Sequence, residues 1–420
     1  MRILHTSDWH LGRALEGHNR QPEQEQFVDE ICALAADQAV HLVLIAGDVF
    51  DNYNPPAWAE QLFCDALDRL SQSGRRAVAV IAGNHDSPDR LSAVRPLATN
   101  QGIVIAGLPL EQPLLFSRPR ATERVRALAQ GEGWLELAVP GCEHTAILSL
   151  LPYPSESRLG RLLSEDLEEY SLRDAYSQMV NEILQRQAAH YRGDTINLAV
   201  SHLFVQGGSA SDSERPIQVG GACTVAVDHL PAAAQYIALG HLHRPQQLKS
   251  APAPAYYSGS PLAYSFSEAN QSKAVYLVDV QPGQAAAVTA IPLQSGIPLE
   301  RWTCTQGLEE AWQRIDNRQG RPAWVDLEVH VPQPISNQEI ARLRQAWPTL
   351  INLRPVLPGQ ELEEREERLA TLALPDIFDR FYRRRRNGAA PSAELVQMFV
   401  QLADAVALQQ DEGQEGGGVR

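Results

Sequence analysis

Seven side chains that can bind metal ions follow five short apolar runs of the sequence. Their metal-binding atoms are carboxylate oxygens, an amide oxygen and imidazole nitrogens, and they belong to Asp8, His10, Asp48, Asn84, His202, His241 and His243. A mixed oxygen and nitrogen set without thiolates suits manganese, iron or zinc rather than calcium, copper(I) or a structural zinc. Seven ligands are too many for one ion, so the set predicts two divalent ions that share a bridging carboxylate. Asp48 lies between the other groups in the sequence, and we expect it to be the bridge.

The five apolar runs have the length and the β-branched content of buried strands. They span residues 2–7, 41–47, 77–83, 195–201 and 235–240. Between the first three runs, apolar residues recur with helical spacing in residues 27–35 and 58–70. This order of strands and helices predicts an α/β fold. In such folds a site forms beyond the carboxyl ends of the strands, which is where the seven residues stand.

Each of the seven positions also has a simpler explanation when it is taken alone. Asp8 or Asp48 could cap a turn, Asn84 could be a turn residue, and a histidine could pack at the end of a strand. All seven occur together, however, and each follows a predicted strand. A shared metal site therefore explains the pattern better than seven separate structural roles.

The composition restricts the class of protein and its partners. A chain of 420 residues predicts two or three domains. The formal net charge of −15 at pH 7 argues against a protein that coats DNA by itself, so a contact with DNA would be local or shared with a partner. Neither a membrane-spanning run nor an export signal is recognisable, and the five cysteines lack paired spacing. We therefore expect a cytoplasmic protein without disulfides or membrane contact.

The sequence divides into four regions. Residues 1–285 contain all the candidate ligands and predict the α/β domain, and residues 286–361 predict a small α+β domain with strand-like alternation around a helical stretch. Residues 362–408 predict C-terminal helices, and residues 409–420 have the composition of a disordered tail. The terminal helices carry apolar stripes formed by Ile377, Phe378, Phe381, Leu395, Met398, Phe399 and Leu402. These stripes predict a surface for a partner, with folding back onto their own domain as the alternative.

The segments that carry the candidate ligands also resemble a known family. In this order, SDWH, GDVFD, GNHD, SH and GHLH resemble the motifs of the calcineurin-like metallophosphoesterases. Longer segments, among them MRILHTSDWHLGR, AGDVFDNYNPPAWA and YYSGSPLAYSFSEANQSKAVYLV, resemble the SbcD family of nuclease subunits within that superfamily. The similarity covers residues 1 to about 285 and continues more weakly in RPAWVDLEV and LPDIFDRFY. It implies a metallophosphoesterase β-sandwich flanked by helices, with a small α+β capping domain and C-terminal helices.

The resemblance implies a role for each residue that matches a family motif. One metal ion would be held by Asp8, His10, Asp48 and His243, and the other by Asp48, Asn84, His202 and His241. His85 matches the position that contacts the scissile phosphate and assists departure of the leaving oxygen. The ions would lower the pKa of a water molecule that attacks phosphorus in line, with His85 as general acid. At Asp51 archaeal relatives often carry a second active-site histidine, whereas this chain has an acid, as bacterial members do.

The resemblance further implies an activity, a cofactor and partners. These are hydrolysis of DNA phosphodiesters with two divalent ions, most suitably Mn²⁺, by 3′-to-5′ exonuclease action on duplex ends and endonuclease action on single strands and hairpins. The ATPase SbcC would bind the C-terminal helices (residues 362–408) and make duplex cleavage ATP-dependent. Two nuclease subunits would pair within a heterotetramer that acts at the nucleoid in DNA repair, recombination and replication.

Two other functions remain open from the sequence. The metal core alone does not select a substrate, so a phosphoesterase for small substrates is one alternative. A non-catalytic scaffold of a DNA-end complex is the other. The region beyond residue 285 favours a macromolecular substrate, and the complete ligand set favours catalysis. Arg13, Arg20 and Tyr53, near the motif loops, are candidates for contact with the DNA backbone, with solvation at the surface as the alternative for each.

Overall fold

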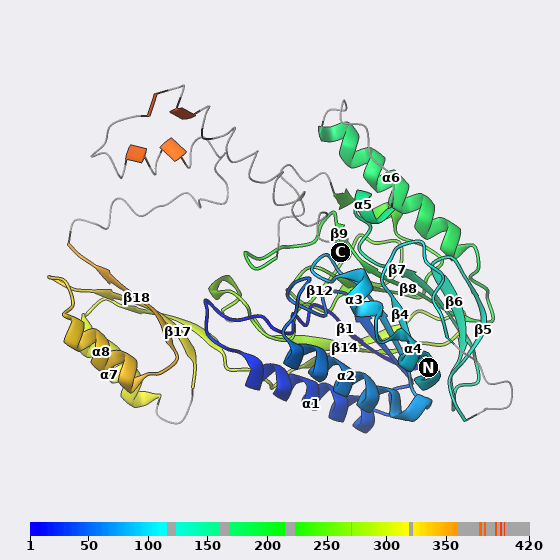
Figure 1. The fold of residues 1–420 in the computed structure, drawn as a ribbon, viewed down its shortest axis with the longest axis horizontal. Helices are drawn as coiled ribbons and strands as arrows, with labels where there is room; N and C mark the ends of the chain where they lie inside the picture. Colours follow the sequence, from blue (N-terminus) through cyan, green and yellow to red (C-terminus); the bar gives the residue numbers. More distant parts are fainter. Residues whose placement is uncertain are drawn as a thin grey trace, which may run out of the picture.

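The computed structural model describes residues 1–115, 123–159, 169–214, 223–269, 271–318 and 322–358, with isolated residues between 378 and 399. These residues form a larger body that contains the N-terminus and a smaller body that contains β17, β18, α7 and α8 (Figure 1). Most of the predicted C-terminal helices (362–408) and the whole predicted tail (409–420) lie outside the described residues. Of the described helices, none is long and apolar enough to span a membrane.

The larger body contains a six-stranded sheet in the order β15-β14-β1-β2-β3-β4. Its strands are β1 (Arg2–Thr6), β2 (Leu42–Ala46), β3 (Ala77–Ile81), β4 (Ile103–Ala106), β14 (Ala274–Asp279) and β15 (Ala287–Pro292). Strands β1 to β4 are parallel, and β14 pairs antiparallel with both β1 and β15. Every residue of β2 and β3 is buried, as their continuous apolar sequences predict for strands covered on both faces. The sheet continues past residue 285, the predicted domain boundary, because β15 extends the antiparallel pairing of β14.

A seven-stranded sheet packs against the first, in the order β12-β13-β11-β8-β7-β6-β5. Its strands are β5 (Arg126–Gly131), β6 (Trp134–Ala138), β7 (Ala146–Leu151), β8 (Ile196–His202), β11 (Tyr236–Gly240), β12 (Gln246–Gln247) and β13 (Ala255–Tyr257). The four strands β7, β8, β11 and β13 are parallel, and the outer strands pair antiparallel. A separate two-stranded pair, β9 (Phe204–Val205) with β10 (Thr224–Val225), follows β8.

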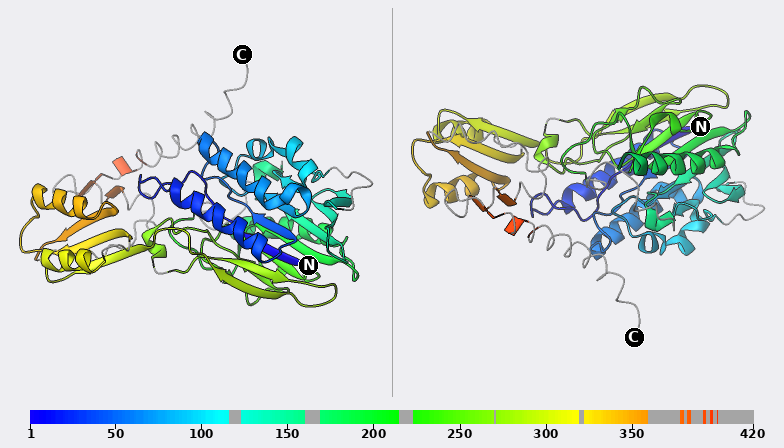
Figure 2. Two further views of the ribbon diagram at one scale, coloured as in Figure 1. Left: turned by 90° about the horizontal axis from the view of Figure 1, so that it is seen from below. Right: turned by 90° about the horizontal axis from the view of Figure 1, so that it is seen from above.

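Apolar side chains from both sheets fill the space between them, so the larger body is a β-sandwich. Leu42 and Leu44 of β2 belong to the same buried cluster as Leu198 and Val200 of β8. Helices α1 (Gln21–Asp37) and α2 (Ala57–Ser71) cover the outer face of the first sheet, and α6 (Glu169–Ala188) covers that of the second (Figures 1 and 2). Short helices complete the body: α3 (Pro88–Ser92), α4 (Arg95–Ala98) and α5 (Glu156–Leu159). The predicted sandwich flanked by helices is confirmed.

The smaller body is a three-stranded parallel sheet with two helices. Its elements are β16 (Leu299–Cys304), α7 (Leu308–Asn317), β17 (Trp324–His330), α8 (Asn337–Ala346) and β18 (Leu350–Val356). Helix α8 begins with a capping box, in which Ser336 and Glu339 satisfy each other's backbone N–H groups. Both helices pack on a core that includes Trp302, Leu327 and Leu343.

A buried ion pair joins the two bodies. Arg20 and Glu23 lie at the start of α1, and the indole Nε1 of Trp324 in β17 donates a hydrogen bond of 3.0 Å to Glu23 Oε1. The guanidinium of Arg20 also lies over the Trp324 ring. Arg20 is only 1% exposed, so it has neither of the roles expected from the sequence, contact with DNA or solvation at the surface. It holds the smaller body against the sandwich.

Candidate metal centre

The seven predicted ligands lie together where strands of both sheets end. Asp8 and His10 follow β1, Asp48 follows β2 and Asn84 follows β3, while the three histidines end or follow β8 and β11. Six of them are at least 96% buried, and Asn84 is half-buried. Candidate ligand atoms of Asp8, His10 and His243 lie within 4.8 Å of one another, and so do those of Asp8, Asp48 and His202. The structure therefore brings together residues that are up to 235 positions apart (His243 − Asp8 = 235).

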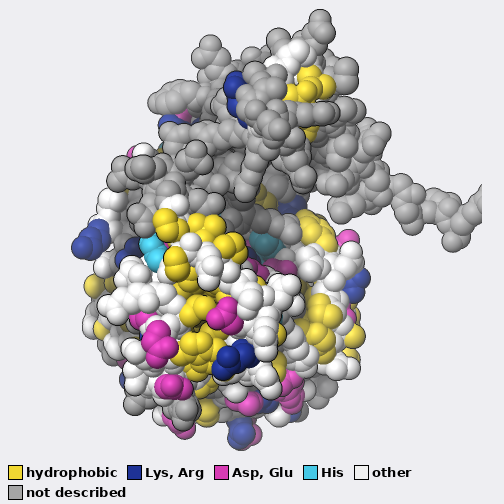
Figure 3. Space-filling view, turned by 90° about the vertical axis from the view of Figure 1, so that its left-hand side faces the viewer, with side chains coloured by type: hydrophobic (Ala, Val, Ile, Leu, Met, Phe, Trp, Pro, Cys, Tyr) yellow, Lys and Arg dark blue, Asp and Glu magenta, His cyan; other side chains and the backbone are white. Residues whose placement is uncertain are grey.

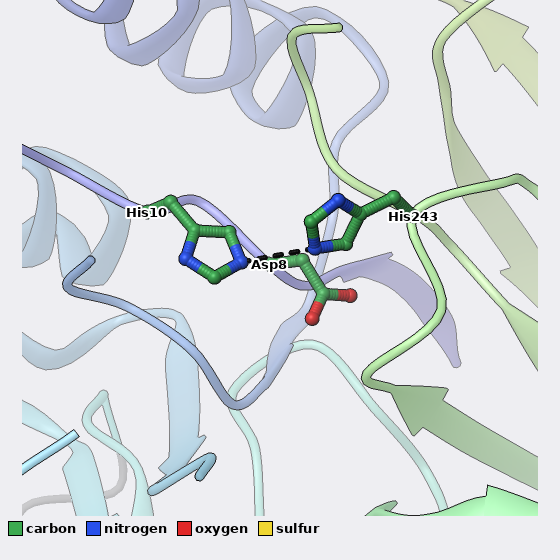
Figure 4. A group of neighbouring side chains, drawn as sticks. All are labelled: Asp8, His10 and His243. Atoms are coloured by element: carbon green, nitrogen blue, oxygen red, sulfur yellow. Dashed lines mark hydrogen bonds between the residues drawn. The ribbon is translucent and has the colours of Figure 1, made fainter. Parts of the chain in front are cut away.

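The first group, Asp8, His10 and His243, faces a common point (Figure 4). The Nε2 atoms of His10 and His243 are 3.0 Å apart. In the second group, His202 Nε2 lies 2.9 Å and His241 Nδ1 lies 3.2 Å from Asn84 Oδ1. These contacts match the two ligand sets that the family resemblance implies.

Asp48 stands between the two groups. Its Oδ2 atom is 3.7 Å from His10 Nε2 and 3.4 Å from His202 Nε2. Its Oδ1 atom accepts a hydrogen bond of 2.8 Å from the backbone N–H of His85. A carboxylate with nitrogen ligands of both groups near one oxygen is suited to bridge two ions.

The turns that carry the ligands have strained backbones. Asp8, His10, Asp48 and His241 have φ angles of 53°, 45°, 49° and 106°. Such conformations cost about 1–3 kcal/mol each for residues with a Cβ atom, and they persist only where neighbouring structure holds them. Here the turns hold one another, because Asp8 N donates to Gly47 O and His10 N donates to Asp48 O, both at 3.0 Å.

Glycines allow the turns to approach this closely. A Cβ atom on Gly83 would lie 2.1 Å from Asp48 Oδ1. A Cβ atom on Gly240 would lie 1.8 Å from the carbonyl oxygen of Ala46 on the facing sheet. Both distances are shorter than a van der Waals contact, so only glycine fits at the two positions.

The hydrogen bonds of His202 provide a test of whether these residues fit a cation. Its Nδ1 lies 2.9 Å from the carbonyl oxygen of Ala46, which can only accept, so Nδ1 carries a proton. The Nε2 atom of the neutral ring then directs a lone pair toward Asn84 Oδ1, another acceptor, at 2.9 Å. Two acceptors at this distance repel each other unless a proton or a metal ion lies between them. The donor arrangement thus fits a bound divalent ion.

Electrostatics in the metal-free protein agree with this test. Burial lowers the pKa of His202, but the neighbouring Asp48 more than offsets it and raises that pKa to about 9. Burial raises the pKa of Asp48, but His202 and His85 together hold it well below its usual value. Burial also raises the pKa of Asp8 to about 6 and lowers the pKa values of His10 and His241. In the absence of metal, His202 and Asp48 are therefore an ion pair at neutral pH.

His85 lies at the edge of the cluster. Its Nδ1 lies 2.6 Å from the carbonyl oxygen of Asp51, so Nδ1 is the protonated nitrogen and Nε2 is turned toward Asp48 Oδ2, 4.0 Å away. The side chain of Asp51 has a different neighbour, since its Oδ1 is 3.6 Å from Nδ1 of His10. Asp51 thus contacts both histidines, His85 through its backbone and His10 through its carboxylate.

Two residues near His85 were missed from the sequence. Asp86 is fully buried and accepts hydrogen bonds from the backbone N–H groups of Val49, Phe50 and Gly83, which ties the turn after β2 to the turn after β3. Arg158 in α5 donates to the carbonyl oxygens of Gly83 and Asp86, at 2.8 and 2.6 Å. Asp86 stands inside the GNHD motif and could have been noticed. Arg158 gave no signal, because its acceptors are backbone atoms of a distant turn.

The sequence was also compared with known proteins. Residues 1–245 match the model of the calcineurin-like phosphoesterase family, and residues 296–386 match that of the type 5 capsule protein repressor C-terminal domain. The chain is 44% identical over 406 residues to the SbcD subunit of the nuclease SbcCD from Bacillus subtilis, covering 97% of this chain and 98% of the relative. It is 29% identical over 395 residues to the protein of that name from Escherichia coli K12, covering 90% and 92% of the two chains. The corresponding protein of Rhodobacter capsulatus is 33% identical over 311 residues, covering 72% and 71%.

Proposed function

The chain belongs to the SbcD family of calcineurin-like phosphoesterases, and we propose from this premise that it is the metal-dependent nuclease subunit of a DNA-end processing complex. The buried cluster around Asp48 is the observation that best supports nuclease chemistry. Its oxygen and nitrogen donors come from both sheets, and several of them face one another as acceptors that a cation would satisfy. Divalent metal ions are accordingly its cofactors.

We assign the ligands to two ions by the groups that the structure brings together. Asp8, His10, Asp48 and His243 would hold one ion, and Asp48, Asn84, His202 and His241 would hold the other. Mn²⁺ suits this mixture of carboxylate, amide and imidazole ligands. Bound divalent ions would supply Lewis acidity toward a phosphate oxygen and would lower the pKa of an attacking water molecule.

The residues of the chain supply the other requirements of the reaction. The acceptor Asp51 O fixes the tautomer of His85, so that Nε2 is directed to the cluster, where it can deliver a proton to the departing sugar oxygen. Arg158 and Asp86 hold the turn that carries His85 from both sides. The near-complete burial of the ligands limits the number of water molecules that compete with the phosphate.

For the finer activities we rely on the named relatives. We propose 3′-to-5′ cleavage of duplex ends, endonuclease action on single strands and hairpins, and ATP-dependent duplex cleavage in complex with SbcC. Two copies of the chain would pair in that complex. A partner also suits the charge of the chain, which is −15 overall. On the face seen in Figure 3, acidic and basic side chains are scattered among apolar ones rather than gathered by sign, so a shared DNA-binding surface is the simpler arrangement.

A nuclease assay tests the activity directly. The purified chain is incubated with Mn²⁺ and hairpin, single-stranded or duplex DNA, with and without SbcC and ATP. We expect cleavage of single strands by the chain alone and cleavage of duplex ends only with SbcC and ATP. The variant Asp48→Ala is the control for contaminating nucleases. Hydrolysis of small phosphodiesters without any cleavage of DNA would favour the alternative of a small-substrate phosphoesterase.

A deletion tests the proposed partner surface. Removal of residues 375–408 should abolish co-purification with SbcC and leave Mn²⁺-dependent cleavage of single strands intact. The physical reason is that the apolar stripes predicted in this segment need a partner to cover them, whereas the metal ligands all precede residue 244. A deleted chain that still forms the complex would contradict this assignment.

A further inference from the structure

A buried ion pair lies directly behind His243. Glu268 is 1% exposed and Lys273 is 8% exposed, and the ammonium of Lys273 is bonded to the Glu268 carboxylate. The other carboxylate oxygen, Oε1, is 3.8 Å from His243 Nδ1, on the side of the ring opposite the nitrogen that faces His10. The nuclease mechanism described above assigns no role to either charge.

The energetics make a purely stabilising role a poor explanation for this pair. Removing two charges from water costs several kcal/mol for each ion, and the attraction between them commonly does no more than offset that cost. An apolar pair of similar volume would fill the same space at least as well. A buried pair in contact with a predicted metal ligand therefore suggests a role in the metal centre.

The contacts of the pair fix the position of His243. Lys273 Nζ donates to the carbonyl oxygen of His243 and to Ser260 Oγ, both at 3.0 Å, and Ser260 N donates to the same carbonyl at 3.1 Å. On the ring, Nδ1 is flanked by Ser213 Oγ at 2.5 Å and by Glu268 Oε1. With the backbone and Nδ1 both held, the ring presents Nε2 to His10.

The two halves of the metal centre are positioned by different means. In the second group the Nδ1 atom of His202 is held by a backbone carbonyl, that of Ala46, which needs no charged partner. In the first group His243 is held by ionised side chains from a segment that follows it in the sequence. Acceptors on the far nitrogen of a ligand histidine orient the ring and increase its basicity toward a metal ion.

We propose that Glu268 and Lys273 are positioning residues of the metal centre, which hold His243 in the orientation that binds the ion of the Asp8–His10–His243 group. This inference rests on the proposed function, because it takes His243 as a ligand. Glu268 orients the ring, and Lys273 balances the charge of Glu268 while fixing the backbone of His243. Loss of either should weaken one of the two ion sites and spare the other.

Calorimetric titration with Mn²⁺ alone, combined with thermal unfolding, tests the proposal. Glu268→Gln should bind Mn²⁺ about 10- to 100-fold more weakly at one site, with unchanged affinity at the second. The matched control is Glu23→Gln, which breaks a similarly buried ion pair, that with Arg20, without touching a predicted ligand. It should lower the Tm and keep both affinities. Single-strand cleavage by Glu268→Gln should fall at limiting Mn²⁺ and recover in excess Mn²⁺.

A double variant separates positioning from stability, even if Glu268→Gln unfolds with Lys273 left unpaired. In Glu268→Gln/Lys273→Met neither charge remains, so the Tm should return toward that of the wild type. The affinity at one Mn²⁺ site should stay reduced. A double variant with two wild-type affinities would overturn the proposal, because the pair would then be only structural. If the wild-type chain bound no Mn²⁺, the proposed metal centre itself would be wrong, and this inference would fall with it.

Discussion

The molecule contains two parallel strand and helix units, and only one of them carries a site. In the sandwich, β1, β2 and β3 alternate with α1 and α2; in the smaller body, β16, β17 and β18 alternate with α7 and α8. After β1 and β2 the chain enters turns in which Asp8, His10 and Asp48 have positive φ. Among the described residues of the smaller body, positive φ occurs only at Gly307. A parallel sheet edge is therefore not sufficient for a site.

Buried charge distinguishes the same two regions. The sandwich buries Asp8, Asp48 and their neighbouring histidines, whereas the buried ionisable side chain of the described smaller body is Asp326, paired with surface arginines. Strained turns and buried charges both cost stability, so a protein retains them where function requires them. Four experiments examine this contrast, beginning with the largest expected effect.

Substitution of the shared carboxylate should have the largest effect. Asp48→Ala should remove the affinity for both Mn²⁺ ions and lower the rate of single-strand cleavage by at least about 10³-fold, since metal ions contribute several kcal/mol to transition-state stabilisation. Asp326→Ala is the matched control, because it removes a buried carboxylate of the other region and should leave the cleavage rate unchanged. Equal losses in the two variants would remove the distinction between the regions.

Substitution of His85 should separate chemistry from metal binding. His85→Ala should keep both Mn²⁺ ions, because the residue is not among the assigned ligands, and should slow cleavage by about 100-fold or more through loss of the general acid. Metal content measured by mass spectrometry and single-turnover cleavage rates provide the comparison. A variant with full metal content and the full rate would rule out the proposed role of His85.

The raised pKa of His202 predicts a pH dependence of metal binding. At pH 7 the metal-free protein carries a proton on His202, whose pKa is about 9, and a bound ion must displace it. The affinity for Mn²⁺ should therefore rise between pH 7 and 9, by up to about tenfold per pH unit. In the metal-free protein, the stability that His202 contributes is complete below its unfolded pKa of about 6.5 and is lost as the pH rises through 9. Calorimetric titrations at several pH values measure the first effect, and affinities that do not change with pH would contradict it.

A core substitution in the smaller body should affect the metal centre least. Leu343 of α8 is fully buried, so Leu343→Ala should destabilise that body by about 2–5 kcal/mol. Hydrogen exchange should then quicken in α8 and β18, while both Mn²⁺ affinities stay at the wild-type values. A parallel loss of metal affinity would show that the two bodies are coupled more tightly than their separate cores suggest.

The sequence predicted the elements and ligands that depend on local pattern. The apolar runs of β1, β2, β3, β8 and β11 and the helical spacing of α1 and α2 mark the sandwich, and each ligand follows a strand. Strand β5 was missed within a region interpreted as a surface excursion, because Arg126–Gly131 is a partly exposed edge strand without an apolar run.

Contacts between distant segments could not be predicted in the same way. The burial of Arg20 depends on Trp324, and the support of His85 depends on Arg158; neither pairing leaves a periodic trace in the sequence. The ion pair behind His243 is equally hidden, because SFSEANQSKAV does not reveal which ring it faces. Such contacts arise from the tertiary fold and have to be seen in a structure.

The place of β1 in its sheet has a consequence for the order of events during synthesis. Strand β1 lies between β2 and β14, with Arg2 opposite Asp279. A growing chain therefore exposes Asp8 and His10 long before the ribosome has made the strand that closes the sheet beside them. His241 and His243 are likewise made late. We expect metal loading to follow synthesis of the entire sandwich, so that an unfinished chain cannot cut DNA while it is still attached to the ribosome.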